Sequence, residues 1–297
     1  MRRKIQELND KNKINTARKY ASALQRFSVY RNLADIPLEE LTTKELKLFE
    51  DHLLRRGVVM NTVSFYMRIL RAVYNKAIIE EIIPPGKPFA AVYTGVARTK
   101  KRAIDEKIIR QLQLFQLKSN LAFARDMFLF SFYTRGMSFI DMANLRKDSI
   151  INGVIAYKRK KTGQQILVGL EPCMAEIIKR HEKMTRGSDL LLPLLYQNGE
   201  AIKYEAALRN QNQRLKKISK QLGLSKNLTT YVSRHTWATI ARSKGISLPI
   251  ISEGMGHTSE QTTRIYLSSL DHRVIDRANR KIIRKENLGK NIDYYAK

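Results

Sequence analysis

The chain has 297 residues, enough for two domains, and its hydrophobic content of 43% supports ordinary buried cores. Its 55 Lys and Arg residues outnumber 27 Asp and Glu and give a net charge of +28, which indicates a polyanion partner, nucleic acid first. The single cysteine, Cys173, excludes an internal disulfide and a multi-cysteine zinc site, and basic residues spread along the whole chain argue against a membrane-surface helix.

No targeting or membrane segment is predicted. The first residues, MRRKIQELNDKNK, lack the apolar segment of a secretory signal, and the longest apolar run, which begins at Leu190, is too short to span a bilayer. We therefore expect a cytoplasmic protein.

Residues 1–97 are predicted to form a small bundle of about four helices. Apolar side chains recur every three or four positions in three successive segments, which is the pattern of amphipathic helices. Thr42 or Thr43 is expected to cap the second segment and Asn61 the third. Prolines from Pro84 onward end the run, because proline cannot continue a helix.

A basic linker, residues 98–103, is predicted to join the bundle to a second domain over residues 104–297. Closely spaced like charges repel one another and keep such a segment extended until phosphates neutralise them. The linker cations proposed to contact DNA are Arg98, Lys100, Lys101 and Arg102.

The second domain is predicted to be mostly α-helical with a small β-sheet. Residues 104–116 and 119–150 have the composition of helices, and the second segment is apolar enough to be central. Alternating aliphatic residues on both sides of Gly163 predict a β-hairpin. Residues 172–223 are expected to be helical with an interrupting loop, and residues 268–297 to form an amphipathic C-terminal tail helix.

Side chains suited to chemistry at a phosphate gather near the C-terminus. Arg234 and His235 are followed by Gly256 and His257, and Tyr266 lies nine positions after His257. Tyrosine is a poor nucleophile at its free pKa of about 10, so a reaction at phosphorus requires neighbours that take up charge. An arginine fork matches two phosphate oxygens. A lone Tyr or Gly-His pair is more often structural, so the interpretation depends on the joint spacing.

This spacing resembles the tyrosine recombinases, or phage-type integrases, whose signature runs His-x-x-Arg-His, then Gly-His, then a nucleophilic Tyr. The resemblance implies a SAM-like core-binding bundle followed by a catalytic domain that needs no metal and no cofactor. Tyr266 would form a 3′-phosphotyrosine, and Arg234, His235 and His257 would hold the phosphate. Tyr231 stands where the family has its first His, and a phenol is a poor proton acceptor near neutral pH.

The resemblance also implies roles for the hairpin and the bundle. Lys161, just before the turn, matches the family's catalytic lysine and could protonate the departing 5′ oxygen. The cations around it crowd the same turn, and any of them could serve only as a phosphate contact. Candidate DNA contacts are Lys158, Arg159 and Lys160 in the hairpin and Lys44, Arg68, Arg71 and Lys76 in the bundle.

The family's first catalytic arginine is displaced in this chain. In the family motif Thr-Gly-x-Arg-x-x-Glu, Ser138 stands where the arginine belongs, three positions before Asp141. If the segment is helical, Arg135 lies one turn earlier on the same face and could reach the phosphate. We therefore predict that Arg135 has taken over this role. The alternative is that Arg135 pairs with Asp141 and a distant cation serves the phosphate.

The resulting hypothesis is a site-specific DNA recombinase, an integrase or invertase. The stretches TRGMSFIDMANLRKDSI and YVSRHTWATIA resemble integrases and promoter-inverting recombinases of Bacteroides-type bacteria and their mobile elements. That resemblance implies double-stranded DNA sites, a monomer in solution, a homotetramer on DNA coupled through the tail helix, and a nucleoid-associated location. Accessory DNA-bending proteins stay open as partners. Two alternatives stay open as well, a type IB topoisomerase-like enzyme and a non-catalytic DNA-binding regulator.

Overall fold

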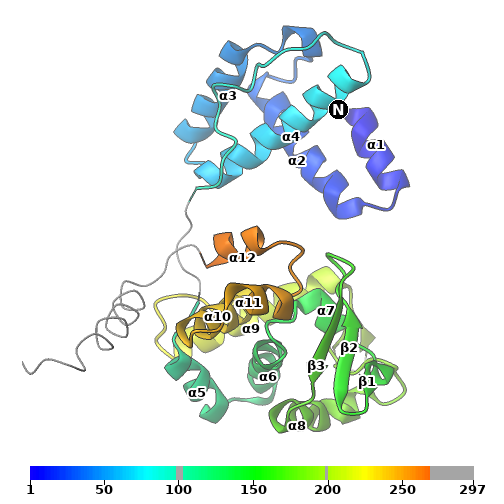
Figure 1. The fold of residues 1–297 in the computed structure, drawn as a ribbon, viewed down its shortest axis with the longest axis vertical. Helices are drawn as coiled ribbons and strands as arrows, with labels where there is room; N and C mark the ends of the chain where they lie inside the picture. Colours follow the sequence, from blue (N-terminus) through cyan, green and yellow to red (C-terminus); the bar gives the residue numbers. More distant parts are fainter. Residues whose placement is uncertain (98–102, 198–199, 268–297) are drawn as a thin grey trace, which may run out of the picture. The chain divides into compact units, whose positions relative to one another are not determined.

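The computed structural model describes residues 1–97, 103–197 and 200–267. The chain divides into two compact units, residues 1–99 and 100–297, each with its own hydrophobic core. Both units are mostly helical, and the second contains a small antiparallel sheet (Figure 1), which confirms the predicted fold class. None of the helices in the described ranges is long and apolar enough to cross a membrane.

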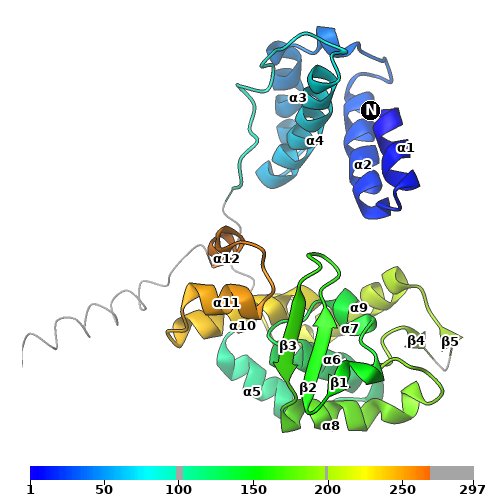
Figure 2. The same cartoon turned by 45° about the vertical axis from the view of Figure 1, so that its right-hand side comes forward.

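The apolar stripes of the first unit meet in one core, where Phe49, Val63 and Met67 are fully buried. The predicted bundle is confirmed, and it includes a first helix that the sequence pattern left unassigned. Lys76 holds that helix through an ion pair with Glu7 at 2.9 Å. Figure 2 shows the first two helices side by side and the third beside the fourth. Within residues 1–97 the elements are α1 (Arg2–Asp10), α2 (Ile14–Tyr30), the short 3-10 turn η1 (Leu38–Glu40), α3 (Thr43–Arg55) and α4 (Met60–Ile79).

One of the two expected helix caps is confirmed. The Thr42 hydroxyl accepts the backbone N–H of the third residue beyond it at 3.2 Å, as an N-cap should. Asn61 is not a cap, because α4 already begins at Met60. Its side-chain amide instead binds both the N–H and the C=O of Ala97, at 2.8 and 2.9 Å. This pairing fastens the segment leading into the linker onto α4. The linker residues Arg98, Lys100, Lys101 and Arg102 lie outside the described residues.

The second unit is built around a buried helix, α6, which contacts α5, α8, α9 and α10, and this confirms the central helix that the sequence predicted. The described elements are α5 (Glu106–Leu114), α6 (Ser119–Tyr133), α7 (Phe139–Ala143), η2 (Lys147–Ser149), β1 (Ile150–Ile151), β2 (Val154–Lys158), β3 (Gln165–Gly169), α8 (Pro172–His181), η3 (Glu182–Thr185), β4 (Tyr196–Gln197), β5 (Glu200–Ala201), α9 (Tyr204–Gln221), α10 (Thr230–Ser243), α11 (Leu248–Gly254) and α12 (Glu260–Tyr266). The predicted tail helix, residues 268–297, lies outside the described residues.

The predicted continuous helix over residues 119–150 is wrong. The chain leaves α6 at Thr134 and turns through left-handed backbone at Arg135 and Gly136, with φ of 60° and 77°. Ser138 then caps the short α7. Arg135 and Ser138 are therefore not one helical turn apart, and the helical reach assumed for Arg135 does not exist.

The predicted β-hairpin is confirmed. Strands β2 and β3 pair antiparallel, from Val154 opposite Gly169 to Lys158 opposite Gln165, and β1 adds a third strand. Gly163 takes a left-handed φ of 73° in the connecting loop, which costs a glycine little. The loop is closed by the Arg159 N–H, which donates to the Gln164 carbonyl at 2.8 Å.

Candidate active site

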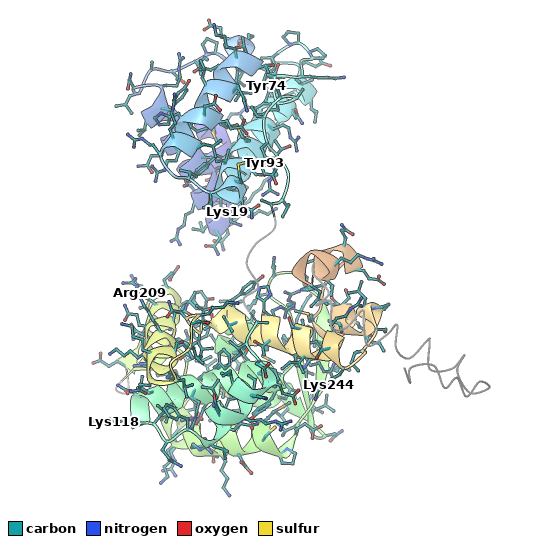
Figure 3. All side chains as sticks on the ribbon, turned by 90° about the vertical axis from the view of Figure 1, so that its left-hand side faces the viewer. Lys19, Tyr74, Tyr93, Lys118, Arg209 and Lys244 are labelled. Atoms are coloured by element: carbon teal, nitrogen blue, oxygen red, sulfur yellow. The ribbon has the colours of Figure 1, made fainter. Side chains whose placement is uncertain are left out.

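Arg234 forms the buried centre of the site. It lies on α10, which Figure 3 shows running toward its C-cap, Lys244, and only 4% of its surface is exposed. Its guanidinium donates to the Gly136 carbonyl at 2.7 Å and to the Met255 carbonyl at 2.6 Å. A Cβ on Gly136 would lie 2.7 Å from the Arg234 Cα, so only glycine lets α10 approach the turn after α6.

His257 lies against Arg234 and is held at both ring nitrogens. Its Nε2 is 3.0 Å from the Arg234 guanidinium, and its Nδ1 is 2.7 Å from the Thr263 hydroxyl. Burial first, and then the positive charges of Arg234, Arg159 and Lys161, lower the pKa of His257 to about 4. The imidazole is therefore neutral near pH 7, in a field made positive by three cations.

Arg159 reaches this cluster from the β2–β3 hairpin. Its side chain is only 6% exposed, and its guanidinium donates to the Gly256 carbonyl, as the Thr162 hydroxyl does at 3.4 Å. A Cβ on Gly256 would lie 2.5 Å from a methyl of Ile166, so the glycine of the Gly-His pair is what lets the hairpin dock. The Nε of Arg159 is buried and has no hydrogen-bond partner within the described residues.

Arg159, predicted as a DNA contact together with two neighbouring lysines, differs from them in being buried. The strand pattern contained the signal, because Ile155, Tyr157 and Arg159 alternate onto one side and Ile155 is fully buried. Lys158 and Lys160, on the other side, are exposed as expected. Lys161 at the loop is also exposed, yet close enough for its charge to act on His257.

Arg135 also faces this interior. Burial and then the charge of Asp141 raise the pKa of Tyr157, the charges of Arg234, Arg159 and Arg135 oppose the shift, and the net value is about 12. The three guanidinium groups are thus close enough to act on a single phenol. The Arg135 side chain passes the end of α11, where its Cδ lies 3.5 Å from the position that a Cβ on Gly254 would occupy.

Ser138 and Asp141 are engaged with each other. The Ser138 hydroxyl donates to the Asp141 carboxylate at 2.6 Å, and the Lys160 N–H donates to the same carboxylate at 2.8 Å. Asp141 therefore links the start of α7 to the hairpin, and Ser138 acts locally as a cap.

The remaining predicted residues of the second unit lie on α10, α12 and the hairpin. The rings of Tyr231 and His235 meet edge to face with centroids 4.6 Å apart, and Tyr231 is 46% exposed. Tyr266 is the last residue of α12, three positions after Thr263. Lys158 and Lys160 border an open groove of about 500 Å³ together with Asp141, Asn144, Arg146 and Gln165. No group of three or more metal-ligating side chains converges in the part of the chain that the structure describes.

The candidate DNA contacts of the first unit differ in how their charges are engaged. Lys76 is paired with Glu7 and Glu80, at 2.9 and 3.1 Å. Arg71 donates to the Thr94 hydroxyl at 3.2 Å. Lys44 and Arg68 are exposed.

Comparisons with known proteins agree with this arrangement. Residues 1–92 match the phage integrase SAM-like domain, and residues 103–273 match the phage integrase family. A tyrosine recombinase of Pseudothermotoga lettingae is 21% identical over 266 residues, covering 88% of this chain and 90% of that protein. The tyrosine recombinase XerC of Syntrophus aciditrophicus is 25% identical over 294 residues, covering 90% and 92%. A lambda integrase tetramer bound to a Holliday junction has a similar fold, with a TM-score of 0.67 at 18% identity over 95% of this chain and 75% of that one.

Proposed function

Because the chain belongs to the phage integrase family and is a tyrosine site-specific recombinase that cleaves and rejoins DNA, we propose that Tyr266 is its nucleophile. The phenol gives up its proton to a base at the site, its oxygen attacks the scissile phosphorus, the bond to the 5′ oxygen breaks, and a 3′-phosphotyrosine forms. Lys161 gives a proton to the departing 5′ oxygen. The 5′ hydroxyl of a partner strand then attacks the phosphotyrosine and restores a continuous strand, so that no external energy source is required.

The positive field around His257 is the observation that carries this proposal. Arg234 and Arg159 are both almost fully buried beside it, and the charge of Lys161 acts on the same imidazole. Burying a guanidinium is costly unless an anion or several hydrogen bonds compensate it. A phosphate oxygen bound here would be stabilised by fixed donors that need no rearrangement as negative charge develops. His235 and Tyr231 complete the proposed set of site residues.

Two guanidinium groups compete for the role of the displaced first arginine. One observation still supports Arg135: its positive charge acts on Tyr157, as the charge of Arg234 does. Arg159 has more direct support, because it binds the carbonyl next to His257 and has a buried Nε without a partner in the described ranges. We therefore propose that Arg159 holds the phosphate together with Arg234, with Arg135 as the competing assignment.

The proposal extends to the oligomeric state of the protein on DNA and to its place in the cell. Lambda integrase, which shares this fold, forms a tetramer on a Holliday junction. We propose the same stoichiometry on double-stranded DNA sites, a monomer in solution, and residence at the nucleoid in the bacterial cytoplasm. The sequence stretches around Arg135 and Arg234 support a Bacteroides-type integrase or invertase.

Trapping on a suicide substrate, a nicked DNA site whose short 5′ fragment diffuses away after cleavage, tests the nucleophile. Wild type should accumulate a protein–DNA species that resists denaturant. Tyr266→Phe should form none while it binds DNA with nearly unchanged affinity, because the basic surface is intact. Tyr20→Phe, a phenol change in the first unit, is the matched control and should trap normally. A covalent species from Tyr266→Phe would show that another group is the nucleophile.

Two further assays separate this function from its alternatives. A topoisomerase-like enzyme would relax supercoiled DNA without joining two sites, and a non-catalytic regulator would form no adduct at all. Strand exchange between two marked DNA sites is expected only of the recombinase.

A further inference from the structure

Thr263 occupies a position that no predicted role explains. It is fully buried on α12, three positions before Tyr266, and its hydroxyl is 2.7 Å from His257 Nδ1. Residues three apart on a helix lie on neighbouring parts of one face. The hydroxyl therefore connects the helix of the proposed nucleophile to the imidazole of the proposed phosphate pocket.

The hydrogen bonds of His257 determine which nitrogen carries its proton. Arginine has only donors, so the Arg234 guanidinium at 3.0 Å must donate to Nε2, which therefore presents a lone pair. A neutral imidazole then carries its proton on Nδ1 and donates it to the Thr263 oxygen. Arg234 thus selects the tautomer of His257, and Thr263 holds the ring in one orientation by accepting from Nδ1.

We infer that Thr263 is a positioning residue, which through its hydroxyl keeps His257 aligned with Arg234 and ties that pair to the helix carrying Tyr266. The inference rests on the proposed function of this site. It deepens that function, because alignment of nucleophile and phosphate then depends on the side-chain hydrogen bond between Thr263 on α12 and His257.

A hydroxyl is suited to this task because it can both accept and donate. To donate to a phosphate oxygen through Nε2, a neutral His257 has to lose the proton at Nδ1 and take one up at Nε2, with no change in net charge. Nδ1 then becomes an acceptor, and the Thr263 hydroxyl can rotate and donate to it. The ring is held in both states. A methyl group in place of the hydroxyl would hold it in neither.

Three variants of α12 test the inference. Thr263→Val replaces the hydroxyl with a methyl of nearly the same size, and Thr263→Ser keeps the hydroxyl. Thr262→Val makes the first change at an exposed neighbour on the same helix. With the suicide substrate, Thr263→Val should form adduct roughly 10- to 100-fold more slowly than wild type, the usual consequence of a misplaced reacting group. Thr263→Ser should recover most of the rate, and Thr262→Val should match wild type.

Nitrogen NMR of labelled histidine reports the protonation and hydrogen bonding of each ring nitrogen of His257. These signals would not change if Thr263 only filled space in the fold. Wild type should show His257 protonated at Nδ1 with that N–H in a hydrogen bond, Thr263→Ser should show the same signature, and Thr263→Val should lose the shift of the Nδ1 signal that this hydrogen bond causes. The inference is overturned by adduct formation in Thr263→Val at the wild-type rate, by failure of Thr263→Ser to recover activity, or by a wild-type proton on Nε2. A wrong nucleophile assignment appears separately, as adduct formation by Tyr266→Phe.

Discussion

The guanidinium of Arg159 donates to the carbonyl of Gly256, which fastens the tip of the β2–β3 hairpin to a segment 97 residues further along the chain. This contact brings the hairpin cations to the imidazole of His257 and buries Arg159 beside Arg234. The candidate site is therefore assembled from the turn after α6, the hairpin, α10 and the Gly-His segment, and each of these contributes a residue of the proposed set.

Cleavage assays on two arginine variants will identify the group that replaces the first arginine. Arg159→Ala should slow adduct formation by roughly 10²-fold or more, the scale for removing one donor that stabilises developing charge. Arg110→Ala, at an exposed arginine of the same unit that pairs with Glu106, is the matched control and should cleave at near the wild-type rate. If Arg135→Ala is the more damaging variant and Arg159→Ala cleaves normally, then Arg135, in the left-handed turn, replaces the first arginine.

Ser138→Ala should leave cleavage nearly unchanged, because its hydroxyl is occupied at the start of α7 and with Asp141. The loss of this cap should lower the free energy of unfolding by about 1 kcal/mol. Chemical denaturation measures the stability, and the suicide substrate measures the rate. A loss of cleavage larger than that of Arg159→Ala would assign Ser138 a direct part in the reaction.

Gly136→Ala should damage the site far more than backbone strain alone explains. Gly136 and Gly153 have nearly the same left-handed φ, 77° and 74°, so alanine costs each about 1 kcal/mol for the conformation. Only at Gly136 would the new methyl meet another residue, 2.7 Å from the Cα of Arg234, whereas Gly153 has open space. For Gly136→Ala, both the midpoint temperature of thermal unfolding and the rate of adduct formation should fall. Gly153→Ala should show only the small loss of stability. Equal behaviour of the two variants would contradict the packing that we describe.

The stability of the protein should carry a pH dependence that originates at His257. Its pKa is lowered from 6.5 to about 4, through burial and then through Arg234, Arg159 and Lys161. Between about pH 6.5 and pH 4 the unfolded chain binds a proton that the folded protein does not, so stability falls as the pH falls through this window. Above the window this group contributes no pH dependence.

The comparison of wild type with His257→Gln isolates that contribution, because other groups titrate equally in both proteins. Urea midpoints at pH 7 and pH 5 should differ more for wild type than for His257→Gln. If both lose the same stability between these pH values, the imidazole is not held in the neutral form by its surroundings.

DNA affinity should fall steeply with salt, and single lysines should contribute measurably to the slope. Each phosphate neutralised adds about −0.9 to the slope of log K against log salt. Lys160→Ala, which removes an exposed cation beside the groove on the hairpin, should flatten the slope by about one unit. Lys76→Ala should change it little, because that ammonium already faces Glu7 and Glu80. A slope unaffected by Lys160→Ala would place the DNA backbone away from the groove.

The sequence by itself determined the elements whose signals are local. The three-to-four-residue recurrence of apolar side chains specified α2, α3 and α4 of the first unit, and alternation around Gly163 specified the hairpin. The spacing of Arg234, His257 and Tyr266 was enough to indicate the family, which the match over residues 103–273 bears out. These features depend on residues within one or two helical turns of each other, or on a motif read along the chain.

Only the tertiary structure decided how those groups meet. The break after α6 could not be predicted from an apolar run, because it is the approach of Arg234, 98 residues away, that requires Gly136 in a left-handed turn. Arg159 was predicted as one of several cations at the hairpin turn, and the docking of the hairpin on Gly256 is what buries it. The alternation along the strand places Arg159 on the same side as the buried Ile155, but it does not say which distant segment covers that side. The sequence shows that this chain has many cations. Only the packing of the hairpin against α10 and the Gly-His segment brings Arg234, Arg159 and Lys161 close to one imidazole.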